Sequence, residues 1–249
     1  MHEIFLSHLQ MQRGTYLGHP IQIANGFYWQ TSRNLEGPEW NFAYGDWPRT
    51  DEDRESVLKT LRLTAERHQT PMAWYTLNPK SRPSFLVKPV AEETWMTRPL
   101  SDLPPPRGRV PLIYSEVESS QDLNLWLDIF EKTFGADGDL DPGYLRAIQT
   151  GSTQAGVRCI RLLGHQNQEA VACGAVFIRE GLAGLYDVAA LPSKQGQGLG
   201  FDMTLALMLK ARELGARTMF LQTEQGTAVE HFYARMGFEK SGTGYLFSW

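Results

Sequence analysis

The sequence predicts an α/β protein of two halves joined by a proline-rich segment, and three observations lead to this prediction. First, a strand-like run ending at Leu191 leads into the loop Gln195-Gly196-Gln197-Gly198-Leu199-Gly200, and a long apolar, helix-like run follows from Phe201. Second, short runs rich in aromatic and β-branched residues, typical of strands, occur on both sides of this unit. Third, the prolines at 104–106 cannot continue a helix or a central strand, which indicates a boundary.

The first part, residues 1–103, holds most of the tryptophans of the chain. Its aromatic and β-branched runs predict strands over 21–30, 40–44 and 71–77. A helix is expected to begin at Thr50, because a capping hydroxyl is followed there by acidic residues that favour the helix dipole. Residues 104–109 are expected to be the linker.

The second part, residues 110–249, alternates strand-like and helix-like segments. The expected helices are one that Ser120 caps, a buried one over 199–214 that Gly215 ends, and a short one opened by Thr227 and Glu230 in a capping box. The expected strands lie over 111–117, 157–163, 170–178, 182–190, 218–222 and 238–249, with a hairpin turn at Gly164-His165-Gln166-Asn167.

The loop from Gln195 to Gly200 predicts a binding site for a phosphate-bearing ligand. The order of strand, tight turn and helix directs several backbone N–H groups and a helix N-terminus to one place. Glycine has no Cβ, so the backbone can close around an anion. One alternative is an ordinary strand-to-helix turn. Another is a dinucleotide fold, but its G-x-G-x-x-G motif would close at the bulky Phe201 or Met203.

Two motifs of this chain resemble the GNAT superfamily of N-acetyltransferases. Gln195-x-x-Gly198-x-Gly200 is similar to the family's Arg/Gln-x-x-Gly-x-Gly/Ala acyl-CoA loop, and 232–238, Phe-Tyr-Ala-Arg-Met-Gly-Phe, is similar to its LYxxxGF segment. The resemblance covers 110–249, while 1–100 is similar only in outline to the degenerate first half of two-domain members. It implies a mixed, centrally splayed sheet in the second half, acetyl-CoA as cofactor and one cofactor site. Gly226 departs from the family, where many members have asparagine.

The resemblance also implies a role for individual residues. The loop residues Gln195, Gly196, Gln197, Gly198, Leu199 and Gly200 would hold the pyrophosphate, and Val188, Ala189 and Ala190 the pantetheine arm. The backbone N–H of Val188 or Ala189 would polarise the thioester carbonyl and hold the oxyanion. Tyr233 would protonate the departing thiolate, since a phenol is neutral at neutral pH. The alternative for Tyr233 is an aromatic ring packed beside Phe232.

A general base is needed because an aliphatic amine is mostly protonated at neutral pH. Asp187 is the first candidate and Glu224 the second, each acting through water. Strand alternation, however, would point Asp187 away from the face of Val188. The aromatic first half and its acids Asp46, Asp51, Glu52, Asp53 and Glu55 are expected either to attract a cationic acceptor or to be core and helix cap.

Composition excludes several classes of protein. With 42% hydrophobic and 21% charged residues and a net charge of −4, the chain is typical of a soluble globular protein and not of a nucleic-acid binder. No stretch approaches the roughly 18 apolar residues of a membrane span, and no signal-peptide pattern is present, so the cytoplasm is the expected location. Cys159 and Cys173 are expected to be buried thiols, and the histidines show no metal-ligand spacing.

The predicted function is acetyl transfer from acetyl-CoA to the primary amine of a small molecule or peptide, directly in a ternary complex. No cysteine or serine stands in a nucleophile signature, which disfavours an acyl-enzyme. The alternatives are a non-catalytic acyl-CoA-binding or regulatory module and, more distantly, a dinucleotide-binding oxidoreductase. The oligomeric state is not predicted.

Overall fold

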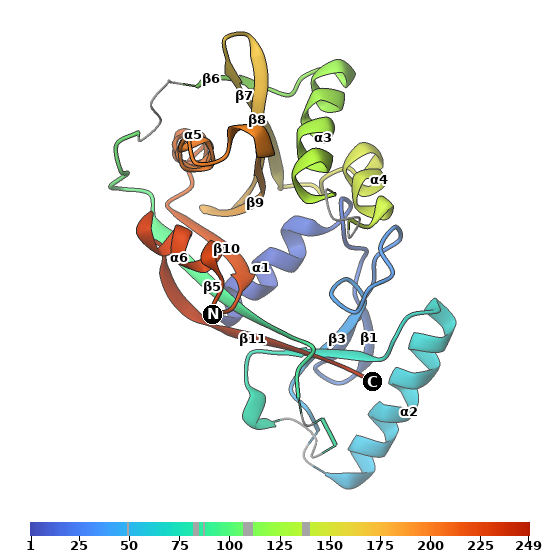
Figure 1. Cartoon of the computed structure of the whole chain (residues 1–249). Helices are drawn as coiled ribbons and strands as arrows, with labels where there is room; N and C mark the ends of the chain where they lie inside the picture. The colour runs from blue at the N-terminus through green and yellow to red at the C-terminus, as the bar shows by residue number, and fades with distance from the viewer. Residues whose placement is uncertain (49, 82–84, 87, 107–111, 136–139) are drawn as a thin grey trace.

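The computed structural model describes residues 1–48, 50–81, 85–86, 88–106, 112–135 and 140–249, and Figure 1 shows its α/β architecture. The helices are α1 (His2–Gln12), α2 (Asp51–His68), α3 (Ser120–Phe134), α4 (Pro142–Thr150), α5 (Leu199–Glu213) and α6 (Ala228–Arg235), with short 3-10 turns η1 (Pro79–Ser81) and η2 (Pro192–Lys194). The strands are β1 (Ile21–Ala24), β2 (Phe27–Gln30), β3 (Phe42–Gly45), β4 (Ala73–Thr76), β5 (Ala91–Pro99), β6 (Ile113–Glu116), β7 (Arg158–Gln166), β8 (Glu169–Arg179), β9 (Leu182–Ala190), β10 (Thr218–Glu224) and β11 (Glu239–Ser248). The predicted α/β class is confirmed.

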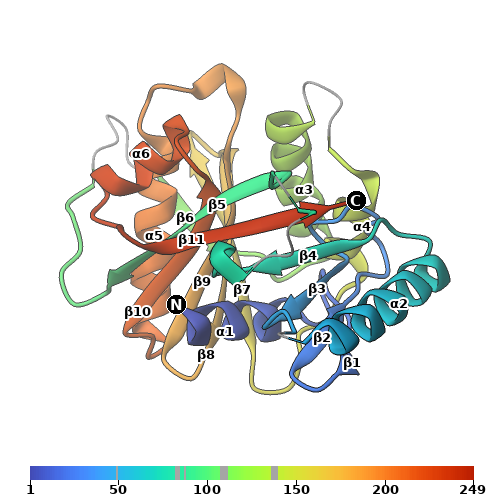
Figure 2. The same cartoon turned by 90° about the horizontal axis from the view of Figure 1, so that it is seen from below.

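The described strands form a single mixed sheet in the order β1-β2-β3-β4-β11-β5-β10-β9-β8-β7-β6. β5 comes from the first half of the chain, yet it pairs antiparallel with β10 and β11 of the second half. β11 in turn pairs with β4 of the first half. Figure 2 shows β5 and β11 side by side through the middle of the molecule. Each half therefore supplies a strand to the sheet of the other.

Helices cover both faces of this sheet. α1 and α3 share one core cluster with aromatic residues such as Tyr75, Trp95 and Phe220. On the opposite face, α2 packs on Trp29 and Trp74, and α5 packs on the β8–β10 region. Figure 1 shows α3 and α5 on either side of β7 and β8. Two thirds of the residues of α5 are buried, which explains its apolar character on most sides.

Two parallel crossovers, β3–α2–β4 and β9–α5–β10, repeat the same motif in the two halves. β9 pairs with β10 only over its first residues, from Leu182 to Gly184. Beyond that point β9 runs on to Ala190 and β10 to Glu224 without pairing to each other. The splay that the family resemblance implies is therefore present.

Several elements differ from the sequence predictions. The run 21–30 is a hairpin, with Gly26 at positive φ in its turn, and the β7–β8 turn lies later than predicted, at Asn167 and Gln168. Ser119 rather than Ser120 caps α3, because its hydroxyl accepts from the Asp122 N–H and the Asp122 carboxylate accepts from the Ser119 N–H. The helices α1 and α4 and the strand β5 were not predicted. The predicted linker lies partly outside the described residues, which end at 106 and resume at 112.

Candidate active site

The glycine loop forms the turn between η2 and α5. Gly196 and Gly198 have φ angles of 77° and 86°, a region that residues with a Cβ rarely adopt. Gly198 is the N-cap of α5, and no side chain caps this helix. The N–H groups of Leu199 and Gly200, in the first turn, have no partner within the helix. An anion such as a pyrophosphate fits here, since it accepts hydrogen bonds from free N–H groups and is favoured by the helix dipole.

Lys194 adds a positive charge directly before the loop and lines the same cavity. Its ion pair with Glu169 is long, at 3.8 Å, so its ammonium is only loosely engaged. Lys194 was not predicted from the sequence, although a basic residue immediately before a phosphate-binding loop is a usable signal.

β9 contains a bulge at Asp187 and Val188. In the ladder with β8, Cys173 pairs with Ala189 whereas Ala175 pairs with Tyr186, so β9 has one extra residue between these pairs. Asp187 has a φ of 59°, which belongs to the left-handed region. A bulge bends a strand and redirects side chains. Asp187 and Val188 both line the cavity, and their side chains lie on opposite sides of β9 as predicted: that of Asp187 contacts Tyr16 and Tyr144, and that of Val188 packs against the α5 cluster.

Two phenols hold the carboxylate of Asp187. The Tyr16 hydroxyl donates to Oδ2 and the Tyr144 hydroxyl to Oδ1, each at 2.6 Å. Burial raises the pKa of Asp187 above its usual value, and the hydrogen bonds from Tyr144 and Tyr16 oppose this by stabilising the charged form. A carboxylate with a raised pKa in a cavity is suited to accepting a proton.

Tyr233 lies on α6 and lines the cavity. Its side chain is hydrogen-bonded to Thr204 of α5, whose hydroxyl donates to the Gly200 carbonyl at 2.8 Å. Burial raises the pKa of Tyr233, so the phenol keeps its proton at neutral pH. Phe232 and Phe238 meet its ring edge-to-face, with centroids 5.0 and 5.6 Å away. These contacts fix the ring, which suits both packing and proton donation.

One cavity of about 660 Å³ joins these groups. The predicted site residues on its wall are Asp187, Val188, Ala189, Ala190, Gln195, Gly196, Gly198, Leu199, Gly200 and Tyr233. Gln197 and Glu224 are exposed and are absent from the lining, so the second candidate base does not face this cavity. Among the described residues, no group of three or more His, Cys, Asp or Glu side chains is placed to hold a metal ion.

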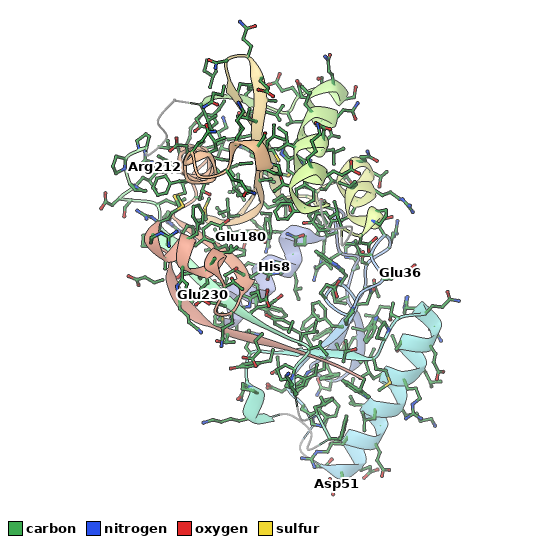
Figure 3. The ribbon with its side chains drawn as sticks, viewed as in Figure 1. His8, Glu36, Asp51, Glu180, Arg212 and Glu230 are labelled. Atoms are coloured by element: carbon green, nitrogen blue, oxygen red, sulfur yellow. The ribbon has the colours of Figure 1, made fainter. Side chains whose placement is uncertain are left out.

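Further lining residues come from elements far away in the sequence: His8 and Gln12 of α1, Trp40, Phe134 of α3 and Tyr144 of α4. Trp40 belongs to the aromatic first part that was expected either to line an acceptor pocket or to be core, whereas the other four were not predicted, because no local pattern marks them. Figure 3 shows His8 at the centre of the molecule, whereas Asp51 lies at the far end of α2. The acidic residues that begin α2 are therefore remote from the cavity, and they stabilise the N-terminus of α2.

A comparison with family models matches residues 123–238 to the acetyltransferase (GNAT) family. Residues 123–238 form a GNAT acetyltransferase domain. The match runs from α3 to just beyond α6, so it includes β9, the glycine loop and Tyr233. Proteins of this family transfer acetyl groups and in general use acetyl-CoA.

Solved structures share the fold at low sequence identity. A GCN5-related N-acetyltransferase from Kribbella flavida is 16% identical with a TM-score of 0.71, over 98% of this chain and 94% of that one. One from Sphaerobacter thermophilus is 14% identical with a TM-score of 0.64, over 92% and 82%. A tandem GNAT protein from the clavulanic acid biosynthesis pathway is 13% identical with a TM-score of 0.64, over 90% and 78%. No curated protein matches this chain.

The β9–α5 crossover of the GNAT domain has a counterpart at β3–α2. A second cavity of about 730 Å³ lies at the end of β3, beside Tyr44, Gly45 and Asp46, and no residue of α2 lines it. Here the Thr50 hydroxyl accepts from the Asp53 N–H, so a side chain already caps the helix. Asp51, Glu52 and Asp53 occupy the first turn and repel anions. The described residues of this loop thus do not offer a second pyrophosphate site. In the described part of the chain, no helix is long and apolar enough to cross a membrane.

Proposed function

We propose that the protein transfers the acetyl group of acetyl-CoA to the primary amine of a small molecule or peptide, directly in a ternary complex in the cytoplasm. The observation that carries this proposal is the single cavity that joins an uncapped helix N-terminus to a bulged strand and a buried carboxylate. We also propose that 110–249 is the catalytic half and 1–103 a degenerate GNAT-like half, linked by 104–109. The repeated crossover supports this division.

The residues present fit coenzyme A. The N–H groups of Leu199 and Gly200, together with Lys194, are suited to the pyrophosphate, and the unpaired edge of β9 offers main-chain groups to the pantetheine arm. When bound, acetyl-CoA supplies the acetyl group as a thioester. The Ala189 backbone is hydrogen-bonded to the Cys173 thiol, which favours the Val188 N–H as the group that polarises the carbonyl.

The proton path uses two of the titratable groups on the cavity wall, Asp187 and Tyr233. As the new N–C bond forms and the C–S bond breaks, Asp187 takes the proton that the amine loses. Tyr233 gives its proton to the sulfur, because its phenol is neutral and held against the loop by Thr204. An ammonium substrate loses one proton before attack and one after it. One of these replaces the proton that Tyr233 gives to the sulfur and the other passes from Asp187 to water, so both residues return to their starting states.

The proposal is tested by incubating the purified protein with acetyl-CoA and a panel of primary amines and measuring free thiol. Thiol release that depends on an amine supports the transferase. Tight binding of acetyl-CoA without any release would instead support an acyl-CoA-binding module.

Replacing Tyr233 by phenylalanine should lower kcat about 10- to 100-fold with little change in the KM for acetyl-CoA. The proton donor is lost while the ring contacts to Phe232 and Phe238 stay. Tyr114→Phe is the matched control, because its hydroxyl also bonds α5, at the Asp202 carbonyl, yet Tyr114 does not line the cavity. An unchanged kcat in the Tyr233 variant would assign that tyrosine to packing.

Replacing Tyr144 by phenylalanine should move the acidic limb of the kcat/KM profile to higher pH. The Tyr144 hydrogen bond stabilises the charged form of Asp187, so its loss raises the pKa of that carboxyl further. Asp187 is then ionised only at higher pH, so the midpoint of the acidic limb lies at higher pH in the variant than in the wild type. Profiles measured for the wild type and for the Tyr16, Tyr144 and Tyr114 phenylalanine variants check this. The shift is expected for the first two variants and not for the third.

A further inference from the structure

A smaller cavity of about 20 Å³ adjoins the active-site cavity. His8 and Gln222 line both cavities, so these two side chains stand between them. A space of this size holds roughly one water-sized group, such as an alkylammonium head. The other residues around it are Phe5, Glu39, Phe42, Tyr75, Glu93, Trp95 and Leu246.

Glu93 brings a half-buried carboxyl group to the small cavity, and burial raises the pKa of this group. The Tyr75 hydroxyl donates to Oε2 at 2.8 Å and itself accepts from the Trp95 indole N–H at 2.7 Å. The second oxygen, Oε1, takes no hydrogen bond from the described residues. Glu39 brings a second carboxylate to the same cavity. Glu39 is exposed, so water stabilises its charge, and a cation placed between the two carboxyl groups would be attracted by both.

His8 supplies a second polar group that lacks a partner. Its side chain is nine-tenths buried, and its Nδ1 is 2.9 Å from the Tyr186 hydroxyl oxygen. Its Nε2 has no hydrogen-bond partner among the described residues. Burial lowers the pKa of His8 to about 3, so the ring is neutral and does not repel a cation. When Nδ1–H donates to Tyr186, the lone pair of Nε2 is free to accept a hydrogen bond.

Aromatic rings complete a setting suited to a cation. Trp95 meets His8 edge-to-face with ring centroids 5.2 Å apart, and Phe42 and Tyr75 line the same cavity, their centroids 5.5 Å apart. Aromatic rings and carboxyl groups on one wall favour an ammonium group over a neutral one.

We propose that the acceptor is a linear aliphatic diamine whose reacting amine lies at Asp187 and whose second ammonium occupies the cavity between Glu39 and Glu93. In this proposal the alkyl chain passes between His8 and Gln222, which line both cavities. This inference rests on the proposed acetyl transfer and adds the substrate class to it.

The test compares diamines from 1,3-diaminopropane to 1,6-diaminohexane with the monoamines of equal chain length. The ratio of kcat/KM between the best diamine and its monoamine should be about tenfold or more, which is the effect of one charged hydrogen bond. Glu93→Gln should bring this ratio close to one. Glu92→Gln is the matched control, because Glu92 is the exposed neighbour on β5 and lines neither cavity, so it should keep the wild-type ratio.

Each outcome decides the question. A wild-type ratio near one, or a ratio that Glu93→Gln leaves unchanged, overturns the diamine inference while acetyl transfer stands. If Glu93→Gln fails to fold, Glu39→Gln, at an exposed residue, decides instead, and an unchanged ratio in it overturns the inference. If no amine releases thiol in any variant, the proposed function and this inference fall together.

Discussion

Gly198→Glu should weaken coenzyme A binding by about 100-fold or more. A Cβ at a φ of 86° strains the loop, and a carboxylate there repels the pyrophosphate from the first-turn N–H groups of α5. Two charged hydrogen bonds lost at roughly 1.5 kcal/mol each already amount to this factor. Isothermal titration of the purified variant with coenzyme A measures the change.

Gly215→Glu is the matched control for this variant. Gly215 has a φ of 90° and lies at the other end of α5, with open space around its Cα. Both substitutions therefore carry a similar backbone strain, but only Gly198 lies at the proposed pyrophosphate site. Equal loss of affinity in both variants, or no loss at Gly198, would contradict the assignment of the loop.

Asp187→Asn should lower kcat by roughly 10²- to 10³-fold, because an amide cannot take up the amine proton. Asparagine has the shape of aspartate and still accepts a phenol hydrogen bond, so the Kd of coenzyme A should stay close to the wild-type value. In the wild type, activity should rise with pH as Asp187 ionises. This rise, the acidic limb of the pH–rate profile, should be absent from the profile of the variant. The exposed Asp128, paired with Lys132, provides the control Asp128→Asn, with unchanged kcat.

The same variant should be more stable than the wild type at neutral pH. Burial raises the folded-state pKa of Asp187. For such a group, the favourable contribution to stability is complete below the unfolded-state pKa and is lost as pH rises through the folded-state pKa. Asparagine does not ionise, so the variant does not lose this stability. Its melting temperature should therefore exceed that of the wild type by a margin that grows as pH rises. A variant that loses activity and gains stability indicates a site held in a strained state for function. Melting curves at acidic and neutral pH measure it.

The loop and Tyr233 could be recognised from the sequence because each belongs to a local motif with fixed spacing. The surroundings of Asp187 could not, since Tyr16 and Tyr144, which hold its carboxylate, come from segments far away in the sequence. His8 belongs to a helix with weak apolar periodicity, and it reaches the active site only because α1 packs beneath β8 and β9. Contacts of this kind depend on how the two halves assemble, and no local pattern records them.

Because β5 and β11 each pair with strands of the other half of the chain, they also determine how the molecule unfolds. A fragment ending before 104 would leave β5 without either neighbour from the second half, and a fragment starting at 112 would lose the strand between β10 and β11. Unpaired edges of this kind promote aggregation. The two halves should therefore unfold together in one cooperative transition. Loss or transfer of one half during evolution would leave the sheet of the other half incomplete.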